Sequence, residues 1–289
     1  MTINEAYLNL RNELNKIYDE KEATNIANLV LEKISGLNKV DRLLNKTKLL
    51  TPSQQNTFSN YKDELLNHKP VQYVLKEAWF AGMKFYVDKS VLIPRPETEE
   101  LVDWIINDFK TPLQNSSINI LDIGTGSGSI AIALKKKLKN TEVFALDISA
   151  ESLETAKKNA NLNNVNIKFF AQDILSKTLQ IELPLFDVIV SNPPYITSKE
   201  MNEMANNVVA YEPHTALFVP DENPLLFYEQ ISEFALTYLK QKGSLYFEIN
   251  EQFAKQIEIL LNKKRYDSIE LKKDLQGKDR MVKAVHNWI

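Results

Sequence analysis

The sequence contains no cysteine, and it has only 7 glycines and 3 histidines among 289 residues. The absence of cysteine excludes disulfides, thiolate metal sites and a cysteine nucleophile. His68, His214 and His286 are far apart along the chain, so we expect no metal centre. No apolar run approaches the roughly 18 residues of a membrane span, and the first residues lack the basic and apolar regions of a signal peptide. We therefore expect a cytoplasmic protein.

An excess of positive charge is also missing, because 35 Lys and Arg stand against 38 Asp and Glu, a net charge of −3. Without a global positive field, we expect no direct binding of nucleic acid. Residues 1–75 are nearly neutral as well, with ten basic and nine acidic residues. The hydrophobic share of 44% and the charged share of 25% are ordinary for a globular protein. We expect a monomer that does not bind membranes.

The spacing of apolar residues divides the chain. As far as residue 75 the spacing is helical and predicts about four helices, the last beginning near Thr51-Pro52-Ser53. From Trp79 to Val91 the period shortens toward two, which predicts a hairpin. We expect a helical domain at residues 1–75 that recognises the substrate, a β-hairpin linker at 76–95 and a catalytic domain at 96–289.

Strands and helices alternate in the catalytic domain. The pattern predicts strands at 118–123, 142–146, 167–171, 186–190 and 243–249, helices at 97–107, 129–138 and 150–161, and a closing antiparallel pair at 268–272 and 281–286. Such alternation predicts a doubly wound, Rossmann-like α/β sheet, which binds its ligands beyond the carboxyl ends of the strands.

The first of these strands leads into a glycine-rich turn that consists of Gly124, Thr125, Gly126, Ser127 and Gly128. Glycines let the backbone turn tightly and approach a ligand closely. A dinucleotide fingerprint would place another glycine at position 129, where this sequence has serine, so a pyrophosphate ligand is not favoured. Asp122, next to the turn, suits a ligand that carries positive charge.

Two further acidic residues follow predicted strands. Asp147 closes the second strand, where a carboxylate can accept hydrogen bonds from both ribose hydroxyls. Asp173 and Ile174 follow the third strand, where Asp173 can accept from an adenine amino group. Each feature alone has a simpler interpretation as a helix start or an N-cap. Together they describe adenosine with a cationic tail and no phosphates, so we expect S-adenosyl-L-methionine as the cofactor.

The fourth strand ends in Asn192, Pro193, Pro194 and Tyr195. Prolines cannot continue a strand ladder, and a residue before proline is held in an extended conformation. The Asn192 side-chain oxygen and the Pro193 carbonyl then offer two acceptors for a planar NH₂ group, on which Tyr195 can stack. Such positioning favours methyl transfer to nitrogen without a strong base. We expect these four residues to be catalytic, with Asn192 also near the cofactor; adenine, cytosine and glutamine all remain possible substrates.

This motif, together with residues 93–99, 211–213 and 274–280, resembles the PrmC/HemK family of protein glutamine methyltransferases. The resemblance covers nearly the whole chain and implies a class I methyltransferase domain with a seven-stranded mixed sheet. It also implies methylation of the glutamine in the Gly-Gly-Gln loop of class 1 peptide chain release factors, which act in translation termination. Residues 124–128 and Asp147 would hold the cofactor, and residues 192–195 the glutamine. Lys76 and Asn250 stand where the family usually has glycine.

Three alternatives stay open. A methyltransferase acting on a ribosomal-protein glutamine would carry the same motif. An adenine-amino DNA methyltransferase would need a basic surface, whereas the cluster at residues 263–265 is better interpreted as a solvated face. A cofactor-binding adaptor without catalysis would leave Asn192 unexplained, because a turn needs only the prolines.

Overall fold

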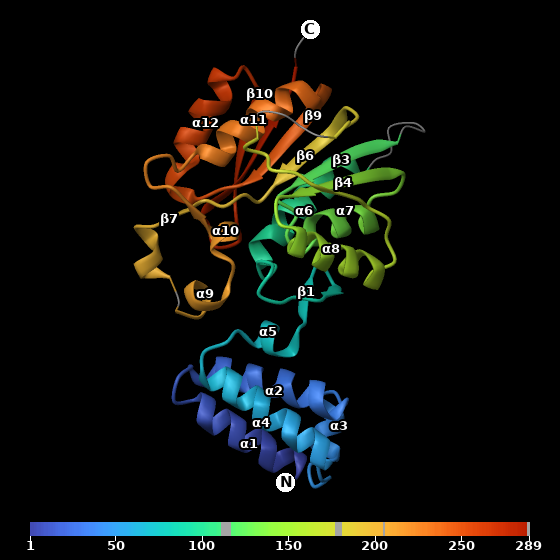
Figure 1. The fold of residues 1–289 in the computed structure, drawn as a ribbon, viewed down its shortest axis with the longest axis vertical. Coiled ribbons are helices and arrows are strands. Elements are labelled where there is room, and N and C mark those ends of the chain that lie inside the picture. Colours follow the sequence, from blue (N-terminus) through green and yellow to red (C-terminus); the bar gives the residue numbers. More distant parts are fainter. Residues whose placement is uncertain (111–116, 177–180, 205, 288–289) are drawn as a thin grey trace. The chain divides into compact units, whose positions relative to one another are not determined.

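The computed structural model describes residues 1–110, 117–176, 181–204 and 206–287 (Figure 1). The chain forms two compact units. The first comprises Met1–Glu77 and Ala205–Tyr211, and the second comprises Ala78–Met204 and Glu212–Ile289. The sequence-based division placed residues 205–211 with the catalytic domain, whereas here they group with the N-terminal helices.

The first unit is helical. It contains α1 (Ile3–Leu14), α2 (Glu20–Ser35), α3 (Lys39–Leu44), α4 (Pro52–Leu66), α5 (Val71–Leu75) and α9 (Asn206–Tyr211). As predicted, Thr51 caps the start of α4, where its hydroxyl accepts from the Gln54 backbone N–H. The prediction that this helix is the last of the bundle was wrong, because α5 follows it. The unit's core includes Leu10, Leu14 and Leu31, all fully buried.

Helix α5 ends at Lys76, which adopts a left-handed conformation with φ of 53°. A side chain in this region is strained, so glycine would adopt this conformation at a lower cost than lysine. The Tyr211 hydroxyl of α9 donates to the Asn67 carbonyl at 2.7 Å and ties α9 to the end of α4.

The second unit begins with a short hairpin of β1 (Ala78–Phe80) and β2 (Met83–Phe85). Ala81 and Gly82, with φ of 51° and 77°, form its turn. It is shorter than predicted because the N–H and carbonyl of Tyr86, just after β2, are bonded to the Asn159 side chain. Helix α6 (Pro96–Phe109) follows.

A seven-stranded mixed sheet forms the centre of this unit and confirms the predicted doubly wound fold. Its strand order is β10-β11-β9-β6-β3-β4-β5. The strands are β3 (Ile118–Ile123), β4 (Thr141–Asp147), β5 (Lys168–Ala171), β6 (Phe186–Ser191), β9 (Leu239–Glu248), β10 (Asp267–Lys273) and β11 (Asp279–Val285). Strands β5, β4, β3, β6 and β9 are parallel to one another, and β11 and β10 complete the sheet with antiparallel pairing.

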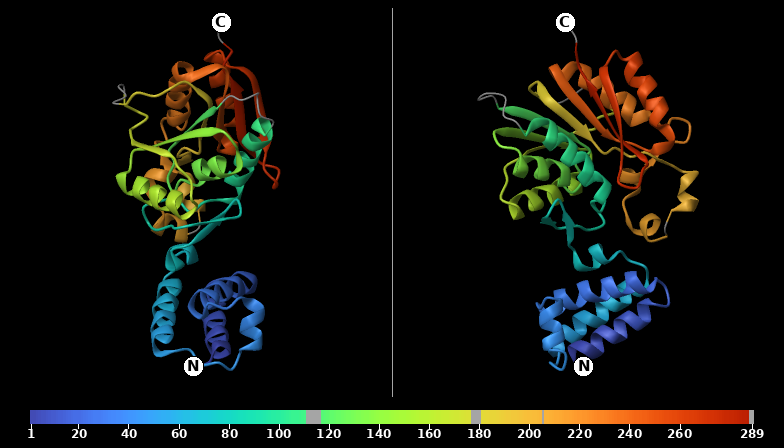
Figure 2. Two further views of the ribbon diagram at one scale, coloured as in Figure 1. Left: turned by 90° about the vertical axis from the view of Figure 1, so that its right-hand side faces the viewer. Right: turned by 180° about the vertical axis from the view of Figure 1, so that it is seen from behind.

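Helices cover both faces of the sheet (Figures 1 and 2). On one face lie α6, α7 (Ser129–Lys137) and α8 (Ala150–Leu162), and on the other lie α11 (Leu226–Tyr238) and α12 (Ala254–Lys263). The central strands are apolar on both sides, as expected for a parallel sheet that is buried on both faces. Because β3, β4, β6 and β9 run in one direction, their carboxyl ends meet at a single edge.

The shorter elements of the second unit lie mainly after β6. They are β7 (Ile196–Thr197), η1 (Glu200–Glu203), α10 (His214–Leu217), β8 (Phe218–Val219) and η2 (Glu251–Phe253). Strands β7 and β8 pair in parallel, so the segment that follows the Asn-Pro-Pro-Tyr motif is held in place. Among the described residues, no helix is both long and apolar enough to cross a lipid bilayer.

Candidate active site

The glycine-rich turn joins β3 to α7 at the edge where the parallel strands end. The backbone N–H groups of Gly124 and Thr125 both donate to the Leu146 carbonyl at 2.9 Å, which fixes the turn to β4. Gly124 and Gly126 have φ of 71° and 53°, a conformation that favours glycine. A Cβ at either position would meet nothing within 4 Å. The backbone there is therefore open to a ligand.

Gly128 is needed for a different reason. It also has a positive φ, of 81°, but a Cβ here would lie 3.0 Å from Ile132 Cδ1 and 3.2 Å from Ala156 Cβ. Gly128 thus allows α7 to pack closely against α8. Neighbouring Ser127 is buried, and its carbonyl accepts from Asn159 Nδ2 at 2.9 Å.

Asp122 lies fully buried beside the turn. Its Oδ2 accepts from the Thr125 hydroxyl at 2.7 Å and from the Ala131 N–H at 3.2 Å. Its Oδ1 has no hydrogen-bond partner among the described residues. Burial raises the pKa of Asp122 from 3.8 to about 7. A positive charge placed near this carboxyl would stabilise its ionised form.

Asp147, at the end of β4, is hydrogen-bonded to the glycine turn. Its Oδ2 accepts from the Gly126 N–H at 2.8 Å, and its Oδ1 accepts from the Ser149 N–H at 2.9 Å. Burial raises the pKa of this carboxyl. Each carboxylate oxygen has two lone pairs, so one acceptor position remains on each oxygen. The structure therefore brings together the turn and Asp147, as the sequence predicted.

Asp173 and Ile174 follow β5 beside Asp147. The Gln172 N–H donates to the Asp147 carbonyl at 3.0 Å, and Asp173 Oδ1 accepts from the Leu175 N–H at 2.9 Å. Asp173 is half-buried, and Ile174 packs against the core on the α11 face. Both residues therefore lie at the same sheet edge as the glycine turn.

The Asn-Pro-Pro-Tyr motif follows β6 at this edge. The Ser191 hydroxyl, immediately before the motif, donates to the Ile123 carbonyl at 2.7 Å and links the end of β6 to the start of the glycine turn. Asn192 and Pro194 are half-buried, and Pro193 is buried. In the part of the chain that the structure describes, no group donates to Asn192 Oδ1 or to the Pro193 carbonyl. Both predicted acceptors are thus free to accept from a ligand as far as the described residues are concerned.

Two residues that the sequence analysis did not single out, Thr98 of α6 and Glu248 of β9, contact the motif. Asn192 Nδ2 donates to Thr98 Oγ1 at 3.2 Å, and Thr98 Oγ1 donates to Glu248 Oε2 at 2.6 Å. The Tyr195 hydroxyl donates to Glu248 Oε1 at 3.0 Å. A carboxylate within the apolar run of residues 245–249 was the available signal, because a buried acid needs partners.

Asn250 holds the motif from the other side. Its Nδ2 donates to the Tyr195 carbonyl at 3.2 Å and to Glu200 Oε1 at 3.0 Å. Its Oδ1 accepts from the Gln252 N–H at 3.0 Å and caps η2. A glycine at this position could make none of these side-chain bonds.

An ion pair between a half-buried arginine and a buried glutamate joins two of the segments that carry the family resemblance. Arg95 Nη2 lies 2.6 Å from Glu212 Oε1, and the Ile93 N–H donates to Glu212 Oε2 at 3.2 Å. Glu212 is only 4% exposed. The pair thus fixes residues 93–95, immediately before α6, to the chain that leads into α10.

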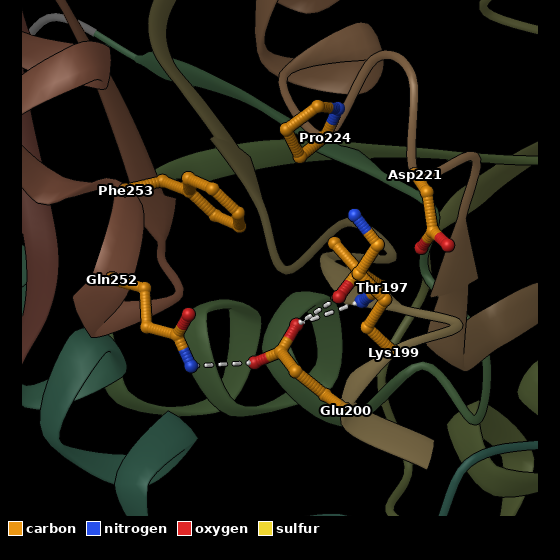
Figure 3. A pocket seen from close by; sticks show the side chains of 7 residues that line it. All are labelled: Thr197, Lys199, Glu200, Asp221, Pro224, Gln252 and Phe253. Carbon is orange, nitrogen blue, oxygen red and sulfur yellow. Dashed lines mark hydrogen bonds between the residues drawn. The ribbon is translucent and has the colours of Figure 1, made fainter.

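A pocket of about 360 Å³ begins two residues beyond Tyr195 (Figure 3). Its lining residues are Thr197, Lys199, Glu200, Asp221, Pro224, Gln252 and Phe253. Glu200 points toward Thr197 and Gln252 and accepts from both side chains, at 2.8 and 3.1 Å. The lining carries one cation, Lys199, and two carboxylates, so its charge does not favour binding of the negatively charged phosphates of nucleic acid. Within the described residues, no cluster of three or more His, Cys, Asp and Glu could hold a metal ion.

Two solved structures share the fold of this chain. A methyltransferase from Pyrococcus furiosus matches 80% of this chain and 100% of its own, with a TM-score of 0.52 and 20% identity. The Thermus thermophilus 16S rRNA N2 G1207 methyltransferase, in complex with AdoMet and guanosine, matches 73% of this chain and 50% of its own, with a TM-score of 0.51 and 18% identity. At these identities the likeness shows the fold alone.

Sequence comparison identifies the family. The methyltransferase small domain matches residues 103–217, and the PrmC N-terminal domain matches residues 5–75. The release factor glutamine methyltransferase of Flavobacterium psychrophilum is 46% identical over 272 residues, 94% of each chain. That of Bacteroides thetaiotaomicron is 39% identical over 275 residues, 95% of this chain and 97% of its own. The chain therefore belongs to the family of release factor glutamine methyltransferases.

Proposed function

We propose that this protein transfers a methyl group from S-adenosylmethionine to the side-chain amide nitrogen of the glutamine in the Gly-Gly-Gln loop of class 1 peptide chain release factors. The observation that carries the proposal is a pair of acceptors, Asn192 Oδ1 and the Pro193 carbonyl, which follow β6 and accept no hydrogen bond from the described residues. The glycine turn follows β3, the neighbouring parallel strand. A binding site for a planar amide thus adjoins a site for the methyl donor.

The residues at the glycine turn fit S-adenosylmethionine. Gly124 and Gly126 leave the backbone open, and Asp147 retains an acceptor position on each oxygen for the ribose hydroxyls. The carboxyl of Asp122 is buried, and its Oδ1 has no hydrogen-bond partner within the described residues, so it suits the positive charge of the sulfonium. When bound, S-adenosylmethionine supplies a methyl group activated for attack by a nucleophile.

The amide nitrogen of glutamine is a weak nucleophile because its lone pair is delocalised into the carbonyl. Asn192 and Pro193 accept both of its hydrogens and orient the nitrogen, while the Tyr195 ring supports the plane of the amide. Acceptors that bind more strongly as the nitrogen becomes pyramidal stabilise the transition state more than the substrate. As the methyl group bonds to the nitrogen its bond to sulfur breaks, and the nitrogen releases one proton; the motif, which includes Pro194, contains no histidine or lysine base.

The choice of a release factor rather than another acceptor is supported by the N-terminal unit. Residues 5–75 match the PrmC N-terminal domain, and both relatives described above carry the release factor name. We assign substrate recognition to this helical unit and place the reaction in the cytoplasm, where release factors act, with the protein as a monomer. The net charge of −3 and the mixed charges of the pocket beside the motif favour a protein substrate over DNA.

The function is tested by transfer of radiolabelled methyl groups from S-adenosylmethionine to purified acceptors. These are a class 1 release factor, the same factor with its loop glutamine changed to alanine, a ribosomal protein rich in exposed glutamine and duplex DNA. We expect label on the first acceptor alone. Label on the glutamine variant, on the ribosomal protein or on DNA would contradict the assignment.

A further inference from the structure

Glu248 is a buried carboxylate at the end of β9 that binds two hydroxyl groups. It is 1% exposed, its Oε2 accepts from Thr98 Oγ1 at 2.6 Å, and its Oε1 accepts from the Tyr195 hydroxyl at 3.0 Å. The Glu248 carbonyl accepts from the Tyr228 hydroxyl at 3.2 Å. Burying an ionised carboxylate this deeply is costly unless hydrogen bonds compensate for its lost hydration.

The direction of each hydrogen bond follows from the charge of Glu248. An ionised carboxylate can only accept, so the single hydroxyl hydrogen of Thr98 must point toward it. The Thr98 oxygen then faces Asn192 only as an acceptor, and Asn192 must present its NH₂ group to Thr98. The carbonyl oxygen of the Asn192 amide is therefore the end left for a substrate.

We propose that Thr98 and Glu248 are positioning residues that fix the side-chain amide of Asn192 with Oδ1 directed to the hydrogens of the substrate glutamine. This inference rests on the proposed function. If the amide of Asn192 were reversed, its NH₂ group would face the substrate NH₂ group, and two donors cannot bind each other. The chain of hydrogen bonds from Glu248 through Thr98 to Asn192, here called the relay, thus decides whether Asn192 can accept from the substrate.

The same carboxylate also holds Tyr195, so one buried group orients two residues of the motif. Burial raises the pKa of Glu248, whereas the hydrogen bonds from Thr98 and Tyr195 and the positive charge of Arg280 favour its ionised form. Of the other groups that face it, Glu97 of α6 is acidic and opposes ionisation, and Tyr228 of α11 is bound to its carbonyl. As the pH falls through the raised pKa, Glu248 gains a proton and can donate as well as accept, so it no longer fixes the direction of the Thr98 hydroxyl.

The first test compares Thr98→Val, which removes the hydroxyl at nearly constant volume, with Thr98→Ser, which keeps it. We expect kcat of Thr98→Val on the release factor to fall by about tenfold to a hundredfold, as on removal of one oriented polar group. Thr98→Ser should retain kcat within about threefold, and neither should change the affinity for S-adenosylmethionine. Equal activity of the two variants would overturn the proposal.

A double-mutant cycle separates positioning from general damage. If Thr98 acts through Asn192, adding Thr98→Val to Asn192→Ala should cause almost no further loss of kcat. If the two losses multiply instead, Thr98 does not act through Asn192 and the proposal fails. The acidic limb of the pH profile of kcat should also disappear in Glu248→Gln, and a limb that persists unchanged would contradict the role of Glu248.

A measurement without methyl transfer keeps this inference distinct from the proposed function. The side-chain NH₂ of Asn192, identified by the NMR signal that Asn192→Ala removes, should exchange with solvent slowly because one hydrogen is bound to Thr98. Thr98→Val should accelerate that exchange, and Thr98→Ser should not. Unchanged exchange in Thr98→Val would overturn the relay even in an active enzyme. Accelerated exchange in a protein that does not methylate the release factor would support the relay and refute the proposed function alone.

Discussion

Replacing Asp147 with alanine should weaken binding of S-adenosylmethionine by somewhat more free energy than it costs the fold. In the structure, the carboxylate already accepts from Gly126 N–H at 2.8 Å and Ser149 N–H at 2.9 Å. One lone pair remains on each oxygen, and each can accept from one ribose hydroxyl.

The magnitude follows from the two hydrogen bonds that the carboxylate would lose. A hydrogen bond to a charged group contributes about 1.5–3 kcal/mol, so even the lower value gives about 3 kcal/mol for two. That corresponds to a dissociation constant roughly a hundredfold higher. The fold loses the acceptor for two backbone N–H groups that are only partly buried, at a cost of about 1 kcal/mol each.

Isothermal titration calorimetry of the folded variants with S-adenosylmethionine measures this effect. Glu151→Gln is the matched control, because Glu151 is exposed in the first turn of α8 and its substitution also removes one negative charge. We expect the control to bind like the wild type. If Asp147→Ala binds within about threefold of the wild type, the assignment of Asp147 to the ribose is refuted.

Three further predictions follow from the site and its supports. Gly128→Ala should lower the free energy of unfolding by about 2–4 kcal/mol because its Cβ would contact Ile132 and Ala156 at a left-handed φ. Gly126→Ala places its Cβ in open space, so it should cost the fold only about 1–2 kcal/mol but should weaken cofactor binding. Urea titration measures the stability of both variants, and calorimetry measures their binding of S-adenosylmethionine. Equal destabilisation by the two substitutions would contradict the packing argument. The pKa of Asp122 is raised from 3.8 to about 7, so its contribution to stability is present below about pH 4 and is lost as the pH rises through 7. Asp122→Asn should therefore gain up to about 4 kcal/mol relative to the wild type between pH 4 and pH 8, and an unchanged difference would refute this. Arg95→Met leaves the Glu212 side chain, which is 1% exposed, without its cation, and should lower the free energy of unfolding by about 3–5 kcal/mol. Glu212→Gln leaves an arginine that is 34% exposed and can be hydrated, so it should lower that free energy less. The reverse order in urea unfolding would contradict the argument.

Much of the catalytic unit could be predicted because its signals are local. A strand that ends in Asp147 or Asn192, followed by a turn, places its last side chain at the carboxyl edge of a parallel sheet, and alternation of strands and helices predicts that sheet. The glycine turn was recognisable for the same reason, since residues 124–128 are consecutive.

The supports of the motif could not be predicted in this way. Thr98 and Glu248 are 150 residues apart in the sequence, and only the fold brings them into contact. Helix α5 was missed because five residues are too few for a helical period to show. The grouping of residues 205–211 with the N-terminal helices likewise depends on contacts between distant parts of the chain.

The most direct test of the account is to locate the methyl group on a class 1 release factor by peptide mass spectrometry after reaction with wild-type protein and with Asn192→Ala. We predict one added methyl group on the glutamine of Gly-Gly-Gln with the wild type, and a rate at least about tenfold lower with Asn192→Ala at similar affinity for S-adenosylmethionine. Methylation at another residue, or undiminished methylation by Asn192→Ala, would contradict the central claim that Asn192 holds the glutamine amide.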